Sequence, residues 1–320
     1  MTSPVLDVRR LSVSYQTDRG PLRALRNVNM TIQPGRIVGI VGESGCGKST
    51  LISTIIRLLA PNARIDGGSI EFMGRDLLGL ESEAMRALRG DGISMVFQDP
   101  MTSLNPVMTI GRQMTDIQHR DNRSRADKLA RAARLLERVG IADPAEQLKR
   151  YPHHLSGGMR QRVAIAMALM TEPALLIADE PTTALDATLE VQIIHRLRQL
   201  QQDFGCAVLF ISHHLGVIAE LCDEVVVMYA GEVVETGSTR EVFLAPRHPY
   251  TRKLLECDPG RIEESTRHLP VIAGKLPDLV DLPKGCVFRS RCTESTDICA
   301  RKQPELEGDD HCAACHVVGQ

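Results

Sequence analysis

The sequence predicts an α/β protein with a mostly parallel sheet, organised around a phosphate-binding loop. Strand-like apolar runs alternate with helix-like runs along most of the chain, which is typical of parallel sheets. The segment 42–50 reads GESGCGKST and fits the pattern G-x-x-x-x-G-K-[ST]. It lies between an apolar run at 37–41, expected to be a buried strand, and a helix-like run at 51–59. A strand, a glycine turn and a helix in this order aim backbone N–H groups and the helix dipole at one anion.

The residue types of this loop each suit polyphosphate. Glycines allow close backbone approach and positive φ angles. Lys48 is placed to reach the β- and γ-phosphates of a nucleotide, and the Ser49 hydroxyl to ligate Mg²⁺. The alternative, a glycine-rich surface turn with a chance lysine, fits the flanking strand and helix poorly. The predicted phosphate-site residues are Gly42, Ser44, Gly45, Cys46, Gly47, Lys48, Ser49 and Thr50.

The composition is that of an ordinary globular protein. With 43% hydrophobic and 24% charged residues, 320 residues suffice for one large or two ordinary domains. The formal net charge of -2 gives no electrostatic case for nucleic-acid binding. No secretory signal is visible at the N-terminus, and no apolar run reaches the roughly 20 residues that span a bilayer. We therefore expect a soluble, cytoplasmic protein.

The first part of the chain predicts antiparallel strands. Apolar residues alternate over residues 5–33, with a turn near 18–21. Tyr15 lies upstream of the phosphate loop, where an aromatic ring could stack on a base, although simple packing is the alternative. Residues 67–72 predict a turn followed by a strand, and 93–97 a buried strand that ends before Gln98.

Between about residues 100 and 160 the pattern indicates a helical insertion. A helix is expected from near Ser124 to Gly140, with apolar residues at helical spacing. Acidic residues are interleaved with its basic ones, which favours a solvated amphipathic face over nucleic-acid contact. The basic residues are Arg120, Arg123, Arg125, Lys128, Arg131, Arg134 and Arg138.

The α/β pattern resumes after the insertion and stops near Pro246, where the chain becomes rich in proline and cysteine. No internal repeat is visible. Helices are expected at 159–170 and 187–201, and strands at 174–178, 207–211, 224–228 and 232–236.

Two further segments carry candidate chemistry. The strand at 174–178 ends in Asp179, a candidate magnesium ligand, and Glu180, which is placed to orient or deprotonate an attacking water. The alternative is two acids that merely start a loop. Ser156, Gly157 and Gly158 open a helix and offer N–H groups to an anion, although a simple helix cap is the alternative.

These motifs together resemble an ABC transporter nucleotide-binding subunit over residues 5 to about 255. The motifs occur in the family's order: Tyr15, Gly42–Thr50, Gln98, Leu155–Met159, Asp179–Glu180, Ala184–Asp186 and His213. The resemblance implies a P-loop NTPase fold with a RecA-like parallel-sheet core, an antiparallel β subdomain and a helical subdomain at about 100–160. It divides the chain into a nucleotide-binding domain, 1–255, and a Cys-rich C-terminal extension, 256–320.

The resemblance also implies roles for single residues. Tyr15 would stack on adenine, and Gln98 would ligate magnesium while sensing the membrane subunit. Ser156, Gly157 and Gly158 would contact the γ-phosphate of an ATP held by a second ABC ATPase subunit, a copy or more usually a paralogue. His213 would hold the γ-phosphate within its own chain, and Ala184–Asp186 would cross the dimer interface. His214 departs from the family pattern, where an acidic or amide residue is frequent.

The cysteines need a separate explanation. There are nine, an odd number in a chain without a visible secretion signal, so a disulfide framework is not expected. The sequence spacings between the cysteines near the end of the chain differ from those of zinc knuckles and ferredoxins. An iron–sulfur cluster, a zinc ion and free or structural thiols all remain open. Five of the nine cysteines lie near the end of the chain, at Cys286, Cys292, Cys299, Cys312 and Cys315.

A narrower resemblance is to the oligopeptide/dipeptide/nickel importer group. It rests on residues 97–106, on 247–251 and on 285–292 with the cysteines and histidines that follow. Some members of this group carry a [4Fe–4S] cluster. By position its ligands would be Cys286, Cys292, Cys299 and Cys315, with Cys312 as the competitor for the last place.

The resemblance therefore predicts the ATPase subunit of an ABC importer for peptides or related small solutes, with ATP and Mg²⁺ as cofactors. Its partners would be a second ATPase subunit, two transmembrane permease subunits and an extracytoplasmic solute-binding protein. It would be peripheral, at the cytoplasmic face of the membrane. A soluble ABC ATPase acting on ribosomes or DNA is the alternative, but such proteins generally carry two cassettes or long coiled-coil insertions.

Overall fold

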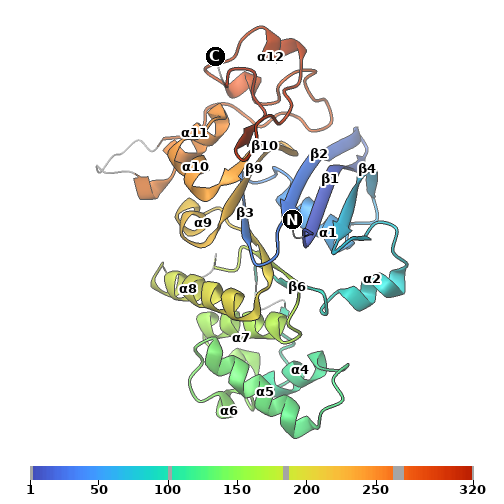
Figure 1. Ribbon diagram of the computed structural model, residues 1–320, viewed down its shortest axis with the longest axis vertical. Helices are drawn as coiled ribbons and strands as arrows, with labels where there is room; N and C mark the ends of the chain where they lie inside the picture. Colours follow the sequence, from blue (N-terminus) through green and yellow to red (C-terminus); the bar gives the residue numbers. More distant parts are fainter. Residues whose placement is uncertain (1–2, 100–102, 183–186, 262–269, 319–320) are drawn as a thin grey trace. The chain divides into compact units, whose positions relative to one another are not determined.

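The chain folds into two compact units, each assembled from segments that are distant in the sequence. The computed structural model describes residues 3–99, 103–182, 187–261 and 270–318 (Figure 1). The first unit comprises Met1–Val5, Gln33–Arg36 and Leu80–Ile211. The second comprises Leu6–Ile32, Ile37–Gly79 and Ser212–Gln320.

The first unit contains parallel strands with candidate acids at the end of one of them. Strands β6 (Ile93–Val96), β7 (Leu175–Asp179) and β8 (Ala207–Ile211) pair in parallel in that order. Their side chains are almost all buried, which explains the uninterrupted apolar runs in the sequence. Helices α2 (Ser82–Leu88), α7 (Gly157–Leu169) and α8 (Ala187–Phe204) belong to the same unit. The strands predicted at these positions are confirmed.

The helical insertion lies in the first unit and is formed by α4 (Ile110–Ile117), α5 (Arg125–Arg138), α6 (Pro144–Gln147) and η1 (Pro152–His154). Helix α5 packs against α4, α6 and α7 (Figure 1). Ser124 caps α5 by accepting a hydrogen bond from the Asp127 N–H, and Gly140, at φ 81°, follows its end. The helix predicted from Ser124 to Gly140 is confirmed.

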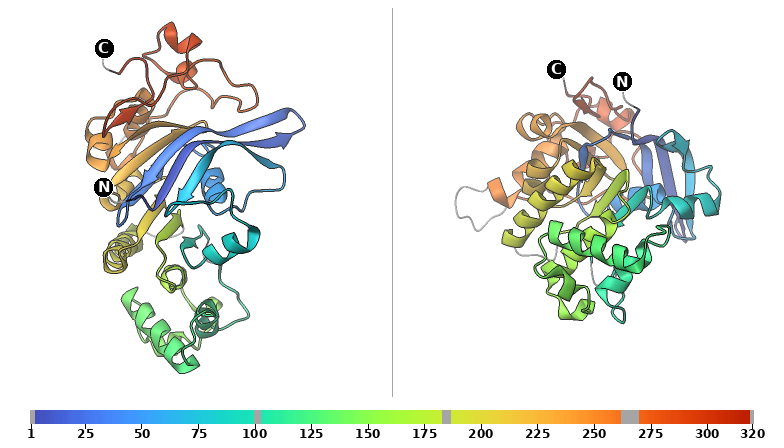
Figure 2. Two further views of the ribbon diagram at one scale, coloured as in Figure 1. Left: turned by 45° about the vertical axis from the view of Figure 1, so that its right-hand side comes forward. Right: turned by 60° about the horizontal axis from the view of Figure 1, so that its bottom comes forward.

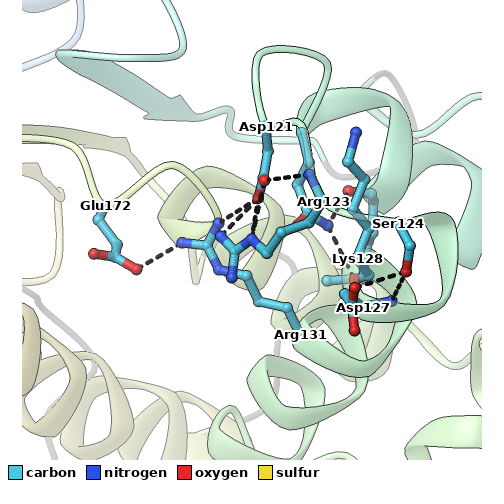
Figure 3. A network of polar contacts seen from close by, with 9 residues as sticks. Asp121, Arg123, Ser124, Asp127, Lys128, Arg131 and Glu172 are labelled. Carbon is cyan, nitrogen blue, oxygen red and sulfur yellow. Dashed lines mark hydrogen bonds and ion pairs between the residues drawn. The ribbon is translucent and has the colours of Figure 1, made fainter.

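The basic face of α5 pairs with neighbouring acids. Figure 3 shows Arg123, just before the helix, against the Asp121 carboxylate, and Arg131 of the helix against Glu172. The Arg123 Nε lies 2.7 Å from an Asp121 oxygen, and the Arg131 Nη2 lies 2.6 Å from a Glu172 oxygen. The hydrogen bonds from Arg123 lower the pKa of Asp121 to about 2. Arg138 likewise reaches Asp203 at 2.6 Å. These pairs match the solvated amphipathic face expected from the interleaved acids.

The second unit contains an antiparallel sheet in the order β2-β1-β4-β5. Its strands are β1 (Leu6–Thr17), β2 (Gly20–Ile32), β4 (Ala63–Phe72) and β5 (Arg75–Asp76). In Figure 2 the blue and cyan strands of this sheet lie side by side. Strand β4 begins at Ala63, so the turn predicted at 67–68 was wrong. Gly68, at φ 95°, instead forms a bulge, and a Cβ there would lie 2.6 Å from the backbone of Arg10.

The second unit also holds the strand that precedes the phosphate loop. Strand β3 (Ile37–Val41) pairs in parallel with β9 (Glu224–Tyr229), and β10 (Glu232–Ser238) pairs antiparallel with β9. Helices α1 (Lys48–Ile55), α9 (Leu215–Leu221), α10 (Thr239–Leu244) and α11 (Pro249–Glu256) complete this region.

The C-terminal extension packs on β9 and α11 through a buried aromatic cluster. Tyr250 and Phe288 are fully buried and pack with Tyr229 of β9 in tilted and edge-to-face arrangements, with ring centroids 4.7–5.4 Å apart. The extension contributes η2 (Pro259–Arg261), η3 (Arg289–Arg291), α12 (Ile298–Arg301) and β11 (Cys312–Ala313). Strand β11 pairs antiparallel with β10. Sparse aromatic residues, rather than a periodic pattern, form this cluster.

A buried carboxylate, Glu235 of β10, ties the extension to the strands. It is fully buried and accepts hydrogen bonds from the backbone N–H groups of Arg247 and His248, at 2.7 and 2.9 Å. The His311 imidazole lies 2.7 Å from the same carboxylate. Burial lowers the pKa of His248 to about 3, so this ring is neutral and caps α11 by accepting from the Tyr250 N–H.

In the part of the chain that the structure describes, no helix is both long and apolar enough to cross a membrane.

Candidate functional site

The phosphate loop forms the turn between β3 and α1, as predicted. The five residues of β3 are buried, and α1 begins at Lys48 directly after Gly47. Gly42, Gly45 and Gly47 all have positive φ angles, 151°, 80° and 108°. A Cβ at Gly42 would lie 2.2 Å from the Met228 carbonyl oxygen, and one at Gly47 would lie 2.8 Å from that of Ala24. Glycine is therefore required here by the packing of the loop as well as by its backbone angles.

Lys48 and Tyr15 are placed at this loop. The Lys48 ammonium donates to the carbonyl oxygens of Gly42, at 2.6 Å, and Glu43, at 3.2 Å. The Tyr15 hydroxyl lies 3.3 Å from that of Thr50, so strand β1 presents this ring beside the start of α1. Burial raises the pKa of the Cys46 thiol although Lys48 opposes the shift, so this cysteine is a neutral packing group.

The loop has one acidic residue, Glu43, which the C-terminal extension holds. The Arg291 guanidinium binds the Glu43 carboxylate through two hydrogen bonds, of 2.6 and 3.0 Å. The Tyr250 hydroxyl accepts a hydrogen bond from the Glu43 N–H at 2.9 Å. Sequence reasoning missed Arg291 and Tyr250, because both were assigned to a family tail pattern and neither is near the loop in sequence. The available signal was the pair of arginines, Arg289 and Arg291, between the apolar and cysteine residues of 285–292.

The first unit carries the candidate carboxylates. Asp179 ends β7 and Glu180 follows at φ 45°, a left-handed conformation that costs energy for a non-glycine residue. The Gln98 amide donates to the Glu180 carboxylate at 3.0 Å, so the structure brings together two residues that were predicted separately. The Glu180 N–H donates to the Ile211 carbonyl oxygen, which fixes the turn after β7. Hydroxyl, carboxylate and amide oxygens of the types at Ser49, Asp179 and Gln98 suit Mg²⁺.

Ser156 caps helix α7, which was the alternative to anion binding that the sequence left open for this segment. Its hydroxyl accepts from the Met159 N–H at 3.3 Å. Ser156 and Gly157 are exposed and Gly158 is buried, and a Cβ at Gly157 would meet no atom within 4 Å. This helix of 13 residues therefore begins at the surface at Ser156 and Gly157.

Two parts of the predicted nucleotide site remain, His213 and residues 184–186. His213 lies in the second unit, directly after β8, and is exposed, with its ring 4.2 Å from that of His214. Asp186 lies outside the described residues, as do Ala184 and Leu185.

Four of the terminal cysteines line one small hollow in the extension. They are Cys286, Cys292, Cys299 and Cys315. Burial raises the pKa of Cys286 to about 11, and the other three thiols add to that effect. Cys312 is turned elsewhere, since its thiol donates to the carbonyl oxygens of Gly308 and Asp309. Among the described residues, no three His, Cys, Asp or Glu side chains are grouped so as to hold a metal ion.

A glycine loop that leads from a buried strand into a helix beginning with lysine, together with a second strand that ends in acidic residues, is typical of a P-loop nucleotide hydrolase. Comparison with known proteins shows which family of P-loop proteins the chain belongs to. The ABC transporter family matches residues 25–183, and the oligopeptide/dipeptide transporter C-terminal region matches residues 234–299. The chain therefore belongs to the ABC transporter family of ATP-binding subunits, whose ATP hydrolysis is coupled to transport.

Three relatives illustrate the similarity. The oligopeptide transport ATP-binding protein OppD of Salmonella typhimurium is 45% identical and covers 94% of this chain and 89% of its own. The dipeptide transport ATP-binding protein DppD of Lactococcus lactis subsp. cremoris is 47% identical, covering 90% and 82%. The solved dimer of the ATP-binding cassette MJ0796 bound to ADP and Pi aligns with a TM-score of 0.66 and 28% identity, over 73% of this chain and 99% of that one.

Proposed function

We propose that this chain is the ATPase subunit of an importer for peptides or related small solutes, at the cytoplasmic face of a membrane. The observation that carries the proposal is the joint presence of an ABC cassette and the oligopeptide/dipeptide C-terminal region in one chain. The names of the relatives, which refer to oligopeptide and dipeptide transport, support the solute class. We take residues 1–255 as the cassette, with its helical part at about 100–160, and 256–320 as the extension.

The residues of the loop support a binding role for ATP and Mg²⁺. The N–H groups of Ser44, Gly45, Cys46 and Gly47 at the start of α1 would hold the β- and γ-phosphates, and Lys48 would exchange its carbonyl contacts for phosphate oxygens. Mg²⁺ would supply charge neutralisation on the phosphates. Ser49, Gln98 and Asp179 would hold that ion, and Tyr15 would stack on the adenine.

Glu180 would orient the attacking water or take its proton. The Gln98 amide N–H donates to Glu180, which leaves the amide carbonyl oxygen directed to other partners. His213 would hold the γ-phosphate. A water positioned by a carboxylate is activated without any covalent intermediate on the protein.

The second half of the proposed site faces a partner subunit. Ser156, Gly157 and Gly158 would contact the γ-phosphate of an ATP bound to a second ABC ATPase subunit, a copy or a paralogue, and Asp186 would lie at that interface. The exposure of Ser156 and the open space around Gly157 support an approach from outside the chain. Exposed apolar side chains at Phe97 and Val107, 46% and 79% exposed, support docking of two permease subunits near Gln98. An extracytoplasmic binding protein would deliver the solute.

Solute uptake by reconstituted transporter tests this function. Vesicles that contain the permease subunits, the binding protein and this chain with its partner ATPase should take up short peptides only with ATP. Lys48→Ala should abolish uptake, whereas Lys302→Ala on the exposed surface of the extension should not. Copurification with ribosomes and no ATP-dependent uptake would contradict the proposal and favour the soluble alternative.

We further propose a [4Fe–4S] cluster on Cys286, Cys292, Cys299 and Cys315. The convergence of these thiols on one hollow supports it, and the position of Cys312 outside the hollow favours Cys315 as fourth ligand. A zinc ion would need its four sulfurs about 2.3 Å from one point, whereas a cluster holds its thiolates farther apart. Since no three His, Cys, Asp or Glu side chains are grouped for a metal ion among the described residues, the proposal rests on the four-cysteine hollow alone. Iron, sulfide and zinc analysis of anaerobically purified protein tests this, and zinc without iron would refute it.

A further inference from the structure

Arg291 of the extension has an unusually complete set of contacts for a side chain outside the cassette. Its side chain is only 3% exposed. Besides the Glu43 carboxylate, its guanidinium donates to the carbonyl oxygens of Ala273 and Ile272, both at 2.9 Å, and to the Tyr229 hydroxyl at 3.3 Å. Together these contacts use all five N–H donors of the group. The contact with Glu43 raises the pKa of Arg291, so the cation is permanent.

Glu43 receives this contact at the point where the phosphate loop is organised. Its N–H donates to the Tyr250 hydroxyl, and its carbonyl oxygen accepts from the Cys46 N–H at 3.2 Å and from the Lys48 ammonium at 3.2 Å. Its carboxylate binds Arg291 in bidentate fashion. One residue thus joins the loop backbone, the loop lysine and two parts of the C-terminal region.

The charge of Glu43 would otherwise oppose the ligand. A carboxylate within a loop that binds a polyanion repels it, and Glu43 is only 28% exposed, so water screens that repulsion incompletely. The bidentate guanidinium neutralises the carboxylate and fixes its direction. Lysine would replace it only in part, because an ammonium supplies the charge but lacks the planar pair of donors that binds both carboxylate oxygens.

We propose that Arg291 is a positioning residue for the phosphate loop, which makes nucleotide affinity depend on the folded C-terminal extension. Arg291 acts through Glu43 and has no contact of its own with the reacting atoms. The inference rests on the proposed ATP-binding role of the loop and adds its regulation by the extension. Because Cys292 is the next residue and lines the four-cysteine hollow, whatever holds that hollow together also holds the Arg291 backbone.

Nucleotide binding by full-length single variants tests the proposal. MgATP affinity is measured by calorimetry or a fluorescent nucleotide analogue, together with KM and kcat in the assembled ATPase. Arg291→Gln should raise the dissociation constant about 10- to 100-fold, since a charged hydrogen-bond pair is broken and the carboxylate is left unpaired. Arg291→Lys should fall in between. KM should rise while kcat at saturating ATP changes little. The matched control is Arg301→Gln, an exposed arginine of the same extension, which should leave affinity unchanged.

A double variant separates neutralisation of the Glu43 charge by Arg291 from mere folding of the extension. In Glu43→Gln/Arg291→Gln the repelling carboxylate is gone, so affinity should return to within about 3-fold of the unmodified chain. A purely structural role of Arg291 would leave the double variant as weak as Arg291→Gln, and that result would overturn the inference. Unchanged affinity in Arg291→Gln would overturn it as well. Failure of the unmodified chain to bind MgATP would instead contradict the proposed function itself. If Arg291→Gln does not fold, Arg291→Lys and the double variant provide the same comparison.

Discussion

The phosphate loop and the start of α7 are the two helix starts at which we propose phosphate contacts, but their surroundings differ. In the loop, a Cβ at Gly42 would collide with the Met228 backbone, and Glu43 is held from the extension. At the start of α7, Gly157 faces open space and Ser156 makes a cap within its own helix. The loop is therefore enclosed by other parts of its own chain, whereas the start of α7 is open at Gly157. This difference supports our proposal that one chain supplies the two halves to two different nucleotides.

The largest expected effect separates hydrolysis from binding. Glu180→Gln should lower ATP hydrolysis about 10²- to 10⁴-fold, the usual contribution of a general base, while MgATP binding is kept. Single-turnover hydrolysis and nucleotide binding on the same preparation measure both. Glu137→Gln, at an exposed acid of α5, serves as the control and should change neither. Unchanged turnover in Glu180→Gln would remove this residue from the mechanism.

A smaller effect tests the packing of the loop. Gly42→Ala should lower the free energy of unfolding by about 2–4 kcal/mol, because the new Cβ would meet the Met228 carbonyl at 2.2 Å and the backbone angle is unfavourable. MgATP affinity should fall with it. Gly157→Ala is the matched control, and urea unfolding should place it within about 0.5 kcal/mol of the unmodified chain. Equal stability of the two variants would refute the contrast between the two segments.

The weakest expected effect concerns a buried ion pair near the loop. Glu232 lies 2.6 Å from Arg26 and accepts a hydrogen bond from Gln303 of the extension. The Arg26 N–H donates to the Gly231 carbonyl oxygen, and the Gly231 N–H donates to that of Cys46. Burial raises the pKa of Glu232 from 4.5 to about 7, and the attraction of Arg26 offsets this only in part. Burial likewise lowers the pKa of Arg26, so both charged forms are disfavoured.

The pH dependence of stability follows from the raised pKa of Glu232. A carboxyl group with a raised pKa binds its proton more tightly in the folded chain. Its contribution to stability is therefore present below about pH 4.5 and is lost as the pH rises towards about 7. The loss is on the order of 1–3 kcal/mol. Glu232→Gln should flatten the unfolding free energy between pH 5 and 7.5, whereas Glu305→Gln, an exposed acid, should not. Parallel pH profiles for Glu232→Gln and the unmodified chain would contradict the shift.

Local patterns predicted what is local. The loop, the acids that end β7 and helix α5 follow from short motifs, caps and periodicity, and the structure has them at the expected positions. The contact of Glu43 with Arg291 spans 248 residues and could not be predicted, because neither neighbourhood indicates a partner. The buried aromatic cluster of Tyr229, Tyr250 and Phe288 could not be predicted for the same reason. Gly68 was misread because a bulge and a turn require the same backbone freedom.

The variant Gly157→Arg tests the contrast between the phosphate loop and the start of α7 most directly. MgATP affinity and ATP hydrolysis are both measured on the same preparation. The central proposal is that the start of α7 serves the nucleotide of a partner subunit. MgATP affinity of the purified chain should then stay within about 2-fold, since its own loop is untouched, while hydrolysis by the assembled ATPase pair falls by about 100-fold or more. Loss of affinity in the isolated chain, or undiminished hydrolysis in the pair, would contradict the proposal.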